Sequence, residues 1–446
     1  MTAIHLNLTF HTIGFHDAAW RHPKVDLTKI YDVDHIINIV KKAEEAKLDA
    51  VFIADSLSVQ RKSLQNNAFQ GFSPLSILSV LATVTKNIGL IGTFSTTFNE
   101  PFNLARGIAT VDHISRGRAG WNVVTTADEA SANNFGLEII PEHQERYDRA
   151  TEFVDVVTKL WDSWEKDALV LNKETGQFAD TSKIHDINHE GDFYKVKGPL
   201  NVHRAPQGRP VLVQAGASNA GIRLAAETGE IVFTAQQDLA EAKALYKEIK
   251  DLAEQEFGRR RSDIKILPGL CLFIGKTREE AQAKFDLLQN LSNIDFALQQ
   301  LTNHIGIDFA QYDLDAPFPE LPDVEEIRAN KSRTELIVSM AKRDNLTLRQ
   351  TLGRLTAGRG HLALIGTATD IADHMEKWVT EQAADGFNLM PQVIEESVDD
   401  IIELLIPELQ KRGLFRTEYA GTTLRDHFGL KQFDESEEKH EQLSHS

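Results

Sequence analysis

Three polar residues stand where short apolar segments end, in positions that suit ligand binding. Asp55 follows the apolar run 50–54, Thr93 lies in a run that begins at Ile88, and Asn122 lies in the run 119–125. In parallel α/β proteins, ligands bind at the carboxyl ends of the strands. A carboxylate, a hydroxyl and an amide there would hydrogen-bond a polar ligand. The simpler alternative is that these residues cap loops, although an amide in a barrel mouth is unfavourable unless it is paired.

A second group of residues suits an anion. Ser218 ends a glycine-containing turn and precedes a helix-forming segment, so free backbone N–H groups and the helix dipole would favour a phosphate there. The alternative, that Ser218 is only a helix N-cap, is compatible with phosphate binding. His143 and Tyr147 share one face of a predicted helix. Either they hydrogen-bond the same ligand, or Tyr147 packs in the core while His143 is solvated.

Histidines are numerous but form no metal motif. Of the 16 histidines, His11, His16 and His22 lie near the end of one predicted strand. His185 and His189 stand four apart in a polar segment without helical periodicity, so we predict no metal site, although this pair leaves the question open. No His-Glu-x-x-His, Gly-x-Ser-x-Gly or Walker-type motif occurs, which disfavours hydrolase and kinase activities.

The elements that must position these residues alternate between short apolar strands and helices. This order predicts a buried parallel sheet closed into a (β/α)8 TIM barrel, with insertions after strands 4 and 7. We expect one domain over residues 1–433 and a polar, disordered tail over 434–446. The insertion 165–209 contains a hairpin-like stretch around 191–200, and the excursion 277–366 contains helices but no clear strand. The predicted strands are 4–10, 50–54, one beginning at Ile88, 119–125, 210–214, 231–234, 265–273 and 385–391.

Composition narrows the class of protein. With 446 residues, 41% of them hydrophobic and 26% charged, the chain can bury a large core. A formal net charge of -18 argues against nucleic-acid or anionic-membrane partners, which need a basic surface. The single cysteine, Cys271, lies in apolar sequence and is predicted to be a buried strand thiol. No run approaches the ~18 apolar residues of a membrane span, so we expect a soluble cytoplasmic protein.

Several motifs resemble those of the bacterial-luciferase-like flavin monooxygenases, specifically the nitrilotriacetate and dibenzothiophene-sulfone monooxygenase group. They follow the family order from near the N-terminus to the last strand, and RAGWNVVT and EHQERYDRA are long enough to be specific. The motifs that carry the resemblance are AAWRHP, IADS, FSTTFNEPFNLARGIATVDHISRGRAGWNVVTT, EHQERYDRATEFV, VLVQAGAS, GRGH and DGFNLMP.

The resemblance implies a barrel that binds reduced FMN supplied by a separate NAD(P)H-dependent flavin reductase. With oxygen, such enzymes insert one oxygen atom next to nitrogen or sulfur in a small molecule. Carried over by position, Asp55, Thr93 and Asn122 would lie near the isoalloxazine and ribityl portion. The ribityl phosphate would be held by His143, Tyr147 and Ser218. If the loops close over the pocket, His11, His16 and Arg359 would face it; we assign the two histidines to catalysis and Arg359 to substrate binding.

These observations lead to one hypothesis and two rivals. The hypothesis is a two-component FMN-dependent monooxygenase acting on a small nitrogen- or sulfur-containing compound. The rivals are a deazaflavin-dependent oxidoreductase on the same barrel and a flavin-binding protein without turnover. The resemblance also predicts a homodimer or homotetramer. No substrate signature is recognisable in the loop 56–71 or in the segment 292–354.

Overall fold

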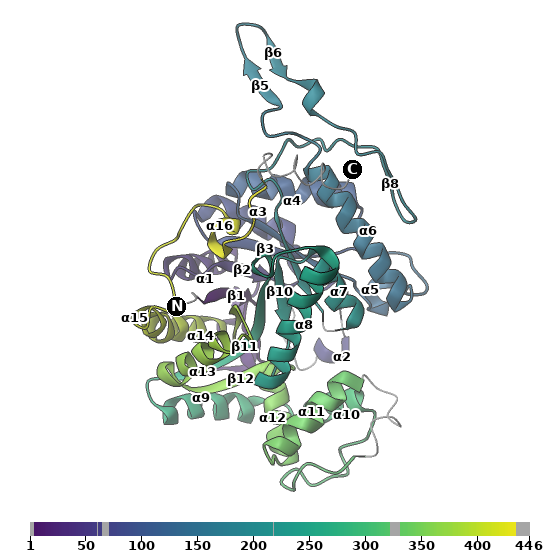
Figure 1. The fold of residues 1–446 in the computed structure, drawn as a ribbon. Coiled ribbons are helices and arrows are strands. Elements are labelled where there is room, and N and C mark those ends of the chain that lie inside the picture. The colour runs from purple at the N-terminus through teal and green to yellow at the C-terminus, as the bar shows by residue number, and fades with distance from the viewer. Residues whose placement is uncertain (1–3, 60, 65–70, 217, 322–330, 434–446) are drawn as a thin grey trace.

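The chain folds into a closed barrel of parallel strands surrounded by helices (Figure 1). This computed structural model describes residues 4–59, 61–64, 71–216, 218–321 and 331–433, so the predicted tail lies outside the described residues. The barrel strands are β1 (His5–Phe10), β2 (Ala50–Ile53), β3 (Gly89–Ser95), β4 (Ala119–Val124), β9 (Val211–Ala215), β10 (Ile231–Thr234), β11 (Lys265–Gly275) and β13 (Gly386–Pro391). They pair in the order β10-β9-β4-β3-β2-β1-β13-β11, and β10 also pairs with β11. The pairing closes the ring, which confirms the predicted TIM barrel.

Helices cover the barrel because those around it turn their apolar faces toward the sheet. On α6, the sequence predicts an apolar stripe of Tyr147, Ala150, Val154, Val157 and Trp161; the last four are buried, whereas Tyr147 is only half-buried. None of the helices in the described ranges is both long and apolar enough to cross a membrane. The helices before β11 are α1 (Val33–Glu45), α2 (Arg61–Leu64), α3 (Pro74–Val84), α4 (Pro101–Ser115), α5 (Glu129–Asn134), α6 (His143–Trp161), α7 (Asn219–Thr228) and α8 (Leu239–Phe257). Among the residues that the structure describes, the 3-10 helices are η1 (Ala19–Arg21), η2 (Leu27–Lys29), η3 (Thr181–Lys183) and η4 (Arg261–Asp263).

The insertion between β4 and β9 forms two hairpins. The predicted one pairs β7 (His189–Glu190) with β8 (Lys195–Val196). A second hairpin, which the polar sequence did not predict, pairs β5 (Leu169–Asn172) with β6 (Gln177–Ala179). It projects away from the body of the barrel (Figure 1).

The excursion after β11 is helical, as predicted, but it also contains a strand. The prediction that 277–366 lacks a strand is therefore wrong at β12 (Leu362–Thr367). β12 pairs with Leu270–Gly275, the part of β11 that extends beyond its pairing with β10. The free edge of β11 beyond β10 exists only in the folded barrel. Because β12 is only half-buried, its sequence shows no clear alternation of apolar and polar residues that would predict a strand. The helices of this region are α9 (Arg278–Leu291), α10 (Ile294–Ile305), α11 (Lys331–Arg343) and α12 (Leu348–Gly358).

The C-terminal segment closes the amino end of the barrel. It contains α13 (Ala368–Thr380), α14 (Ile394–Asp400), the π-helix η6 (Ile401–Leu405), α15 (Ile406–Lys411) and α16 (Leu424–Phe428). Leu424 and Phe428 join the apolar side chains inside the barrel. A Cβ on Gly89 would lie only 2.2 Å from Leu424 Cδ1, so any larger residue there would make the Leu424 side chain shift. Only the carboxyl ends of the strands are therefore left to form an active-site mouth.

A buried ion pair holds this closure in place. Arg425 Nη1 and Nη2 donate to the two carboxylate oxygens of Glu230 at 2.6 and 2.9 Å, and the Arg425 side chain is 1% exposed. Leu212 N also donates to Glu230, at 3.0 Å. The pair thus ties α16 to β9 and to the residue that precedes β10.

We predict that Glu230→Ala destabilises the protein because it leaves a buried guanidinium without its counter-charge. The free energy of unfolding, measured by denaturant titration, should fall by about 3–5 kcal/mol. The control is Arg278→Ala, which breaks the exposed pair with Asp370 and should change stability by less than ~1 kcal/mol. Equal effects of the two variants would contradict this role for Glu230.

Candidate active site

Thr93 and Asn122 meet at the carboxyl ends of adjacent strands. They are register partners on β3 and β4, and Asn122 Nδ2 donates to Thr93 Oγ1 at 3.0 Å. The Asn122 Oδ1 atom is buried and has no hydrogen-bond partner among the described residues; the same holds for Thr9 Oγ1 and His11 Nδ1 at the end of β1. A buried polar atom without a partner is unfavourable by about 1–3 kcal/mol. Three such atoms at the barrel mouth indicate a polar ligand.

Asp55 shares a cavity with Thr93. The cavity has a volume of about 300 Å³ and is also lined by Ser95, Thr126 and Asp128. Ser56 N donates to Asp55 Oδ1 at 2.9 Å, and burial raises the pKa of the Asp55 carboxyl. Residues of the loop after β2, of β3 and of the segment after β4 therefore surround one polar space.

Asp128 organises the outer wall of this cavity. It caps α5 by accepting from Ser131 N at 2.9 Å, and it accepts a hydrogen bond from Ser58 Oγ. It thereby ties the loop after β2 to the segment after β4. Sequence reasoning did not single out Asp128, although its position before a short helix is a capping signal.

Ser218, Tyr147 and His143 form a second cluster at the amino end of α7. Ser218 is the N-cap of α7, since its Oγ accepts from Gly221 N at 3.2 Å, so the N-cap interpretation is confirmed. Its Oγ also lies 3.4 Å from Tyr147 Oη. The rings of His143 and Tyr147 are 4.9 Å apart between centroids. The structure thus brings together all three residues that the resemblance assigned to a phosphate.

Glycines make room for an anion at this cluster. A Cβ on Gly216 would lie 3.4 Å from Tyr147 Oη, and one on Gly221 would lie 3.1 Å from the same oxygen and 3.2 Å from Ser218 Oγ. The backbone therefore approaches two hydroxyl groups closely at a helix amino end. Such a place attracts an anion through N–H groups and the helix dipole.

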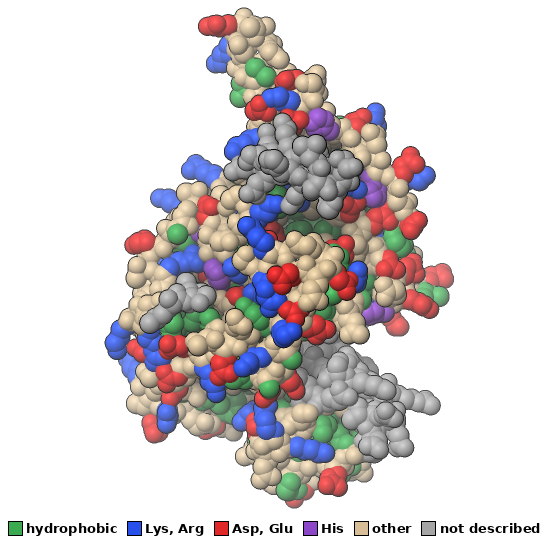
Figure 2. All heavy atoms as spheres, viewed as in Figure 1, with side chains coloured by type: hydrophobic (Ala, Val, Ile, Leu, Met, Phe, Trp, Pro, Cys, Tyr) green, Lys and Arg blue, Asp and Glu red, His purple; other side chains and the backbone are tan. Residues whose placement is uncertain are grey.

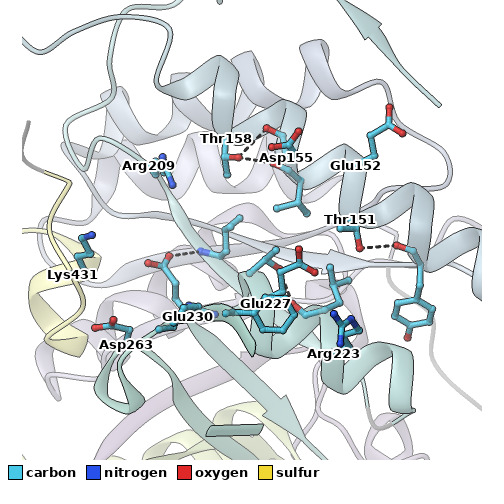
Figure 3. Close-up of a pocket in the computed structure, with 18 of the residues that line it drawn as sticks. Thr151, Glu152, Asp155, Thr158, Arg209, Arg223, Glu227, Glu230, Asp263 and Lys431 are labelled. Carbon is cyan, nitrogen blue, oxygen red and sulfur yellow. Dashed lines mark hydrogen bonds between the residues drawn. The ribbon is translucent and has the colours of Figure 1, made fainter. Parts of the chain in front are cut away.

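A larger cavity, of about 1030 Å³, lies between α6 and α7 on the outside of the barrel (Figure 3). It touches the anion cluster at Tyr147 and extends to Glu230 and Lys431 near the closed end. Acidic and basic side chains both point into it, for example Glu227 and Arg223. We place the chemistry at the mouth instead, because parallel barrels bind ligands at their carboxyl ends.

The loop after β1 is held against the end of β13. Gly14 has φ +136°, and a Cβ there would lie 2.3 Å from the Gln392 carbonyl oxygen, so no side chain fits. Phe15 N donates to the Pro391 carbonyl at 2.8 Å. The loop therefore carries His11 and His16 to the mouth in a defined geometry.

The two histidines differ in what they contact. His16 Nδ1 accepts from Ala18 N at 3.0 Å, and its Nε2 lies 3.3 Å from Gln289 Nε2, so both nitrogens have protein partners. His11 Nδ1 has none among the described residues. Burial lowers the pKa of each imidazole to about 4, so both are neutral at pH 7. The geometry favours His11 over His16 as a group that contacts a ligand.

Arg359 lies beside this loop. It ends α12 in the left-handed conformation, with φ 46°, and forms an ion pair with Asp17. Its guanidinium carbon is 4.8 Å from the centre of the Phe15 ring. Asp17 was missed by sequence reasoning because only the fold brings it to Arg359, which lies far along the chain.

Each of the two histidines of the insertion, His185 and His189, contacts a carboxylate. His185 Nε2 lies 2.8 Å from Glu165 Oε1, and His189 Nε2 lies 3.0 Å from Glu152 Oε1. Within the described ranges, no three or more His, Cys, Asp or Glu residues are arranged to hold a metal ion. Cys271 is fully buried in β11, as predicted.

Comparisons with known proteins identify the family of this chain. The family model for luciferase-like monooxygenases matches residues 10–385. The chain is 49% identical over 419 residues to N-acetyl-S-(2-succino)cysteine monooxygenase of Bacillus subtilis (strain 168), covering 94% of each chain. It is 45% identical over 439 residues to nitrilotriacetate monooxygenase component A of Aminobacter aminovorans, covering 96% of each. The structure of DmoA from Hyphomicrobium sulfonivorans superposes with a TM-score of 0.85 at 33% identity, covering 96% of this chain and 93% of that one.

Each comparison spans nearly the whole barrel, including both residue clusters at the mouth. This chain is an enzyme that belongs to the luciferase-like monooxygenase family, in the nitrilotriacetate monooxygenase group that its motifs predicted.

Proposed function

We propose that this enzyme is the oxygenase component of a two-component system. It takes reduced FMN from a separate NAD(P)H-dependent reductase and transfers one oxygen atom from O2 to a small thioether or amine that carries carboxylates. The name of one relative, a component A, supports a partner protein. Two relatives are named for substrates with several carboxylates, N-acetyl-S-(2-succino)cysteine and nitrilotriacetate.

The residues at the mouth fit FMN. The phosphate would be held by Ser218, Tyr147 and the amino end of α7, with His143 beside them. The partnerless Asn122 Oδ1 and the Thr93 hydroxyl would face the ribityl and ring portion, and Asp55 would complete that wall. Bound reduced FMN would supply the electrons that activate oxygen.

The observation that carries this proposal is that the barrel mouth has two sites, one suited to the flavin ring and ribityl chain and the other suited to the phosphate. One presents buried polar atoms without partners, and the other presents hydroxyl groups and N–H groups at a helix amino end. A flavin mononucleotide needs both, because its ring system forms hydrogen bonds while its phosphate carries negative charge. The surrounding barrel wall excludes water from the reacting groups.

Ser218→Asp tests the phosphate anchor. Aspartate is as good an N-cap as serine, so α7 should remain folded. Its negative charge would repel the phosphate, and we expect FMN to bind at least about tenfold more weakly, as measured by fluorescence titration. The matched control is Ser218→Asn, which has the same size and capping ability but no charge, and should bind FMN more tightly than the aspartate variant. Unchanged affinity in Ser218→Asp would refute the anchor.

Oxygenation assays test the reaction. With reduced FMN and oxygen, we expect N-acetyl-S-(2-succino)cysteine or nitrilotriacetate to be oxidised, with product followed by mass spectrometry and one atom of 18O2 incorporated. If these compounds and a wider panel of amines and thioethers give only hydrogen peroxide, the protein is a flavin binder without turnover. Turnover with reduced deazaflavin but not with reduced FMN would support the oxidoreductase rival.

A further inference from the structure

Asp17 and Arg359 form an ion pair at the edge of the barrel mouth. Their side chains are 18% and 33% exposed, so the pair is largely shielded but open to small molecules. Asp17 belongs to the loop that Gly14 fixes against β13, and Arg359 belongs to the end of α12. The pair therefore joins two elements that the chain brings together only on folding.

A line of aromatic rings connects this pair to the inside of the barrel. The Arg359 guanidinium lies over Phe15, and the Phe15 and His361 rings are 6.2 Å apart. His361 stacks on Phe233 of β10 at 5.2 Å, and Phe233 contacts Phe52 of β2 at 5.5 Å. The cation thus stands at the outer end of an apolar wall that leads into the mouth. An anionic group of a substrate would meet Arg359 while its apolar or sulfur-containing part lies along the rings.

The charges around the pair are balanced. Burial dominates the lowering of the pKa values of His11 and His16, while Arg359 lowers and Asp17 raises them by smaller amounts. Arg359 also acts on Cys271, whose pKa burial raises to about 12. At pH 7 the ion pair therefore contributes one cation and one anion, while the buried imidazoles of His11 and His16 and the Cys271 thiol beside it are neutral. A second anion would upset this balance.

We propose that the Asp17 carboxylate occupies the position on Arg359 that a carboxylate of the substrate takes when the substrate binds. An anionic substrate therefore binds by displacing Asp17 from Arg359. The inference rests on the proposed function and names its substrate-recognition residues. Displacement leaves two carboxylates near one guanidinium, so binding of the anion is accompanied by uptake of a proton by the cluster. Asp17 is thereby a specificity-determining residue: neutral molecules gain nothing from displacing it.

Calorimetric titration of the FMN-loaded chain, without reductant, tests this proposal. The probes are N-acetyl-S-(2-succino)cysteine and its fully esterified, neutral form, each titrated in two buffers of different ionisation enthalpy to count protons. In Asp17→Asn, the acid should bind about tenfold more tightly with less proton uptake, because its competitor is gone. The ester should bind as it does to the wild-type enzyme.

Two further variants keep the test decisive. Asp26→Asn changes an exposed carboxylate in the same loop region and should alter neither measurement. Arg359→Gln should bind the acid about tenfold or more weakly and should leave the affinity for the ester unchanged. This variant replaces Asp17→Asn as the test if Asp17→Asn does not fold. Oxidation of acid and ester alike, with unchanged affinities in both Asp17→Asn and Arg359→Gln, would overturn the inference and leave the proposed function standing. If the wild-type enzyme neither binds nor oxidises either probe, the proposed substrate class is wrong and the inference falls with it.

Discussion

Polar atoms buried without partners at the barrel mouth are the constraint on which the rest of the structure depends. Asn122 Oδ1, Thr9 Oγ1 and His11 Nδ1 are each unfavourable in the protein as it stands. The barrel keeps them in place because Asn122 pairs with both neighbouring strands and Thr9 pairs with β2. His11 is carried by the loop that Gly14 holds against the end of β13. A ligand that hydrogen-bonded them would remove the penalty, so under the proposed function the site is pre-organised for the flavin and would need little rearrangement to bind it.

Closure of the opposite end of the barrel places the polar groups of the mouth next to an apolar interior. Leu424 and Phe428 fill the amino end, and the Arg425–Glu230 pair holds them there, so apolar side chains pack at the end opposite the polar rim. Hydrogen bonds and charges are stronger in such surroundings than in water. The molecular surface, by contrast, carries scattered acidic and basic side chains (Figure 2), in keeping with a formal net charge of -18. Recognition of the anionic substrate proposed above would thus depend on local cations such as Arg359 and not on the overall field.

The sequence predicted those parts of the site that depend on local pattern. The apolar runs that contain Thr93 and Asn122 predicted that these residues lie near strand ends, and the glycine turn before Ser218 predicted that it lies at a helix amino end. It did not predict β12, because that strand exists only where β11 extends past β10. It also missed Asp17, whose relation to Arg359 depends on two loops meeting across 342 residues of chain. Contacts of this kind are set by tertiary packing, which leaves no periodicity in the sequence.

A crystal structure of the enzyme with FMN is the most direct test of the central claim. The account predicts the phosphate within hydrogen-bonding distance of Ser218 Oγ and Tyr147 Oη. It also predicts a flavin heteroatom or ribityl hydroxyl within hydrogen-bonding distance of Asn122 Oδ1. A phosphate bound instead in the groove between α6 and α7 near Arg223, or after β11 and β13, with Asn122 Oδ1 still unpaired, would contradict it.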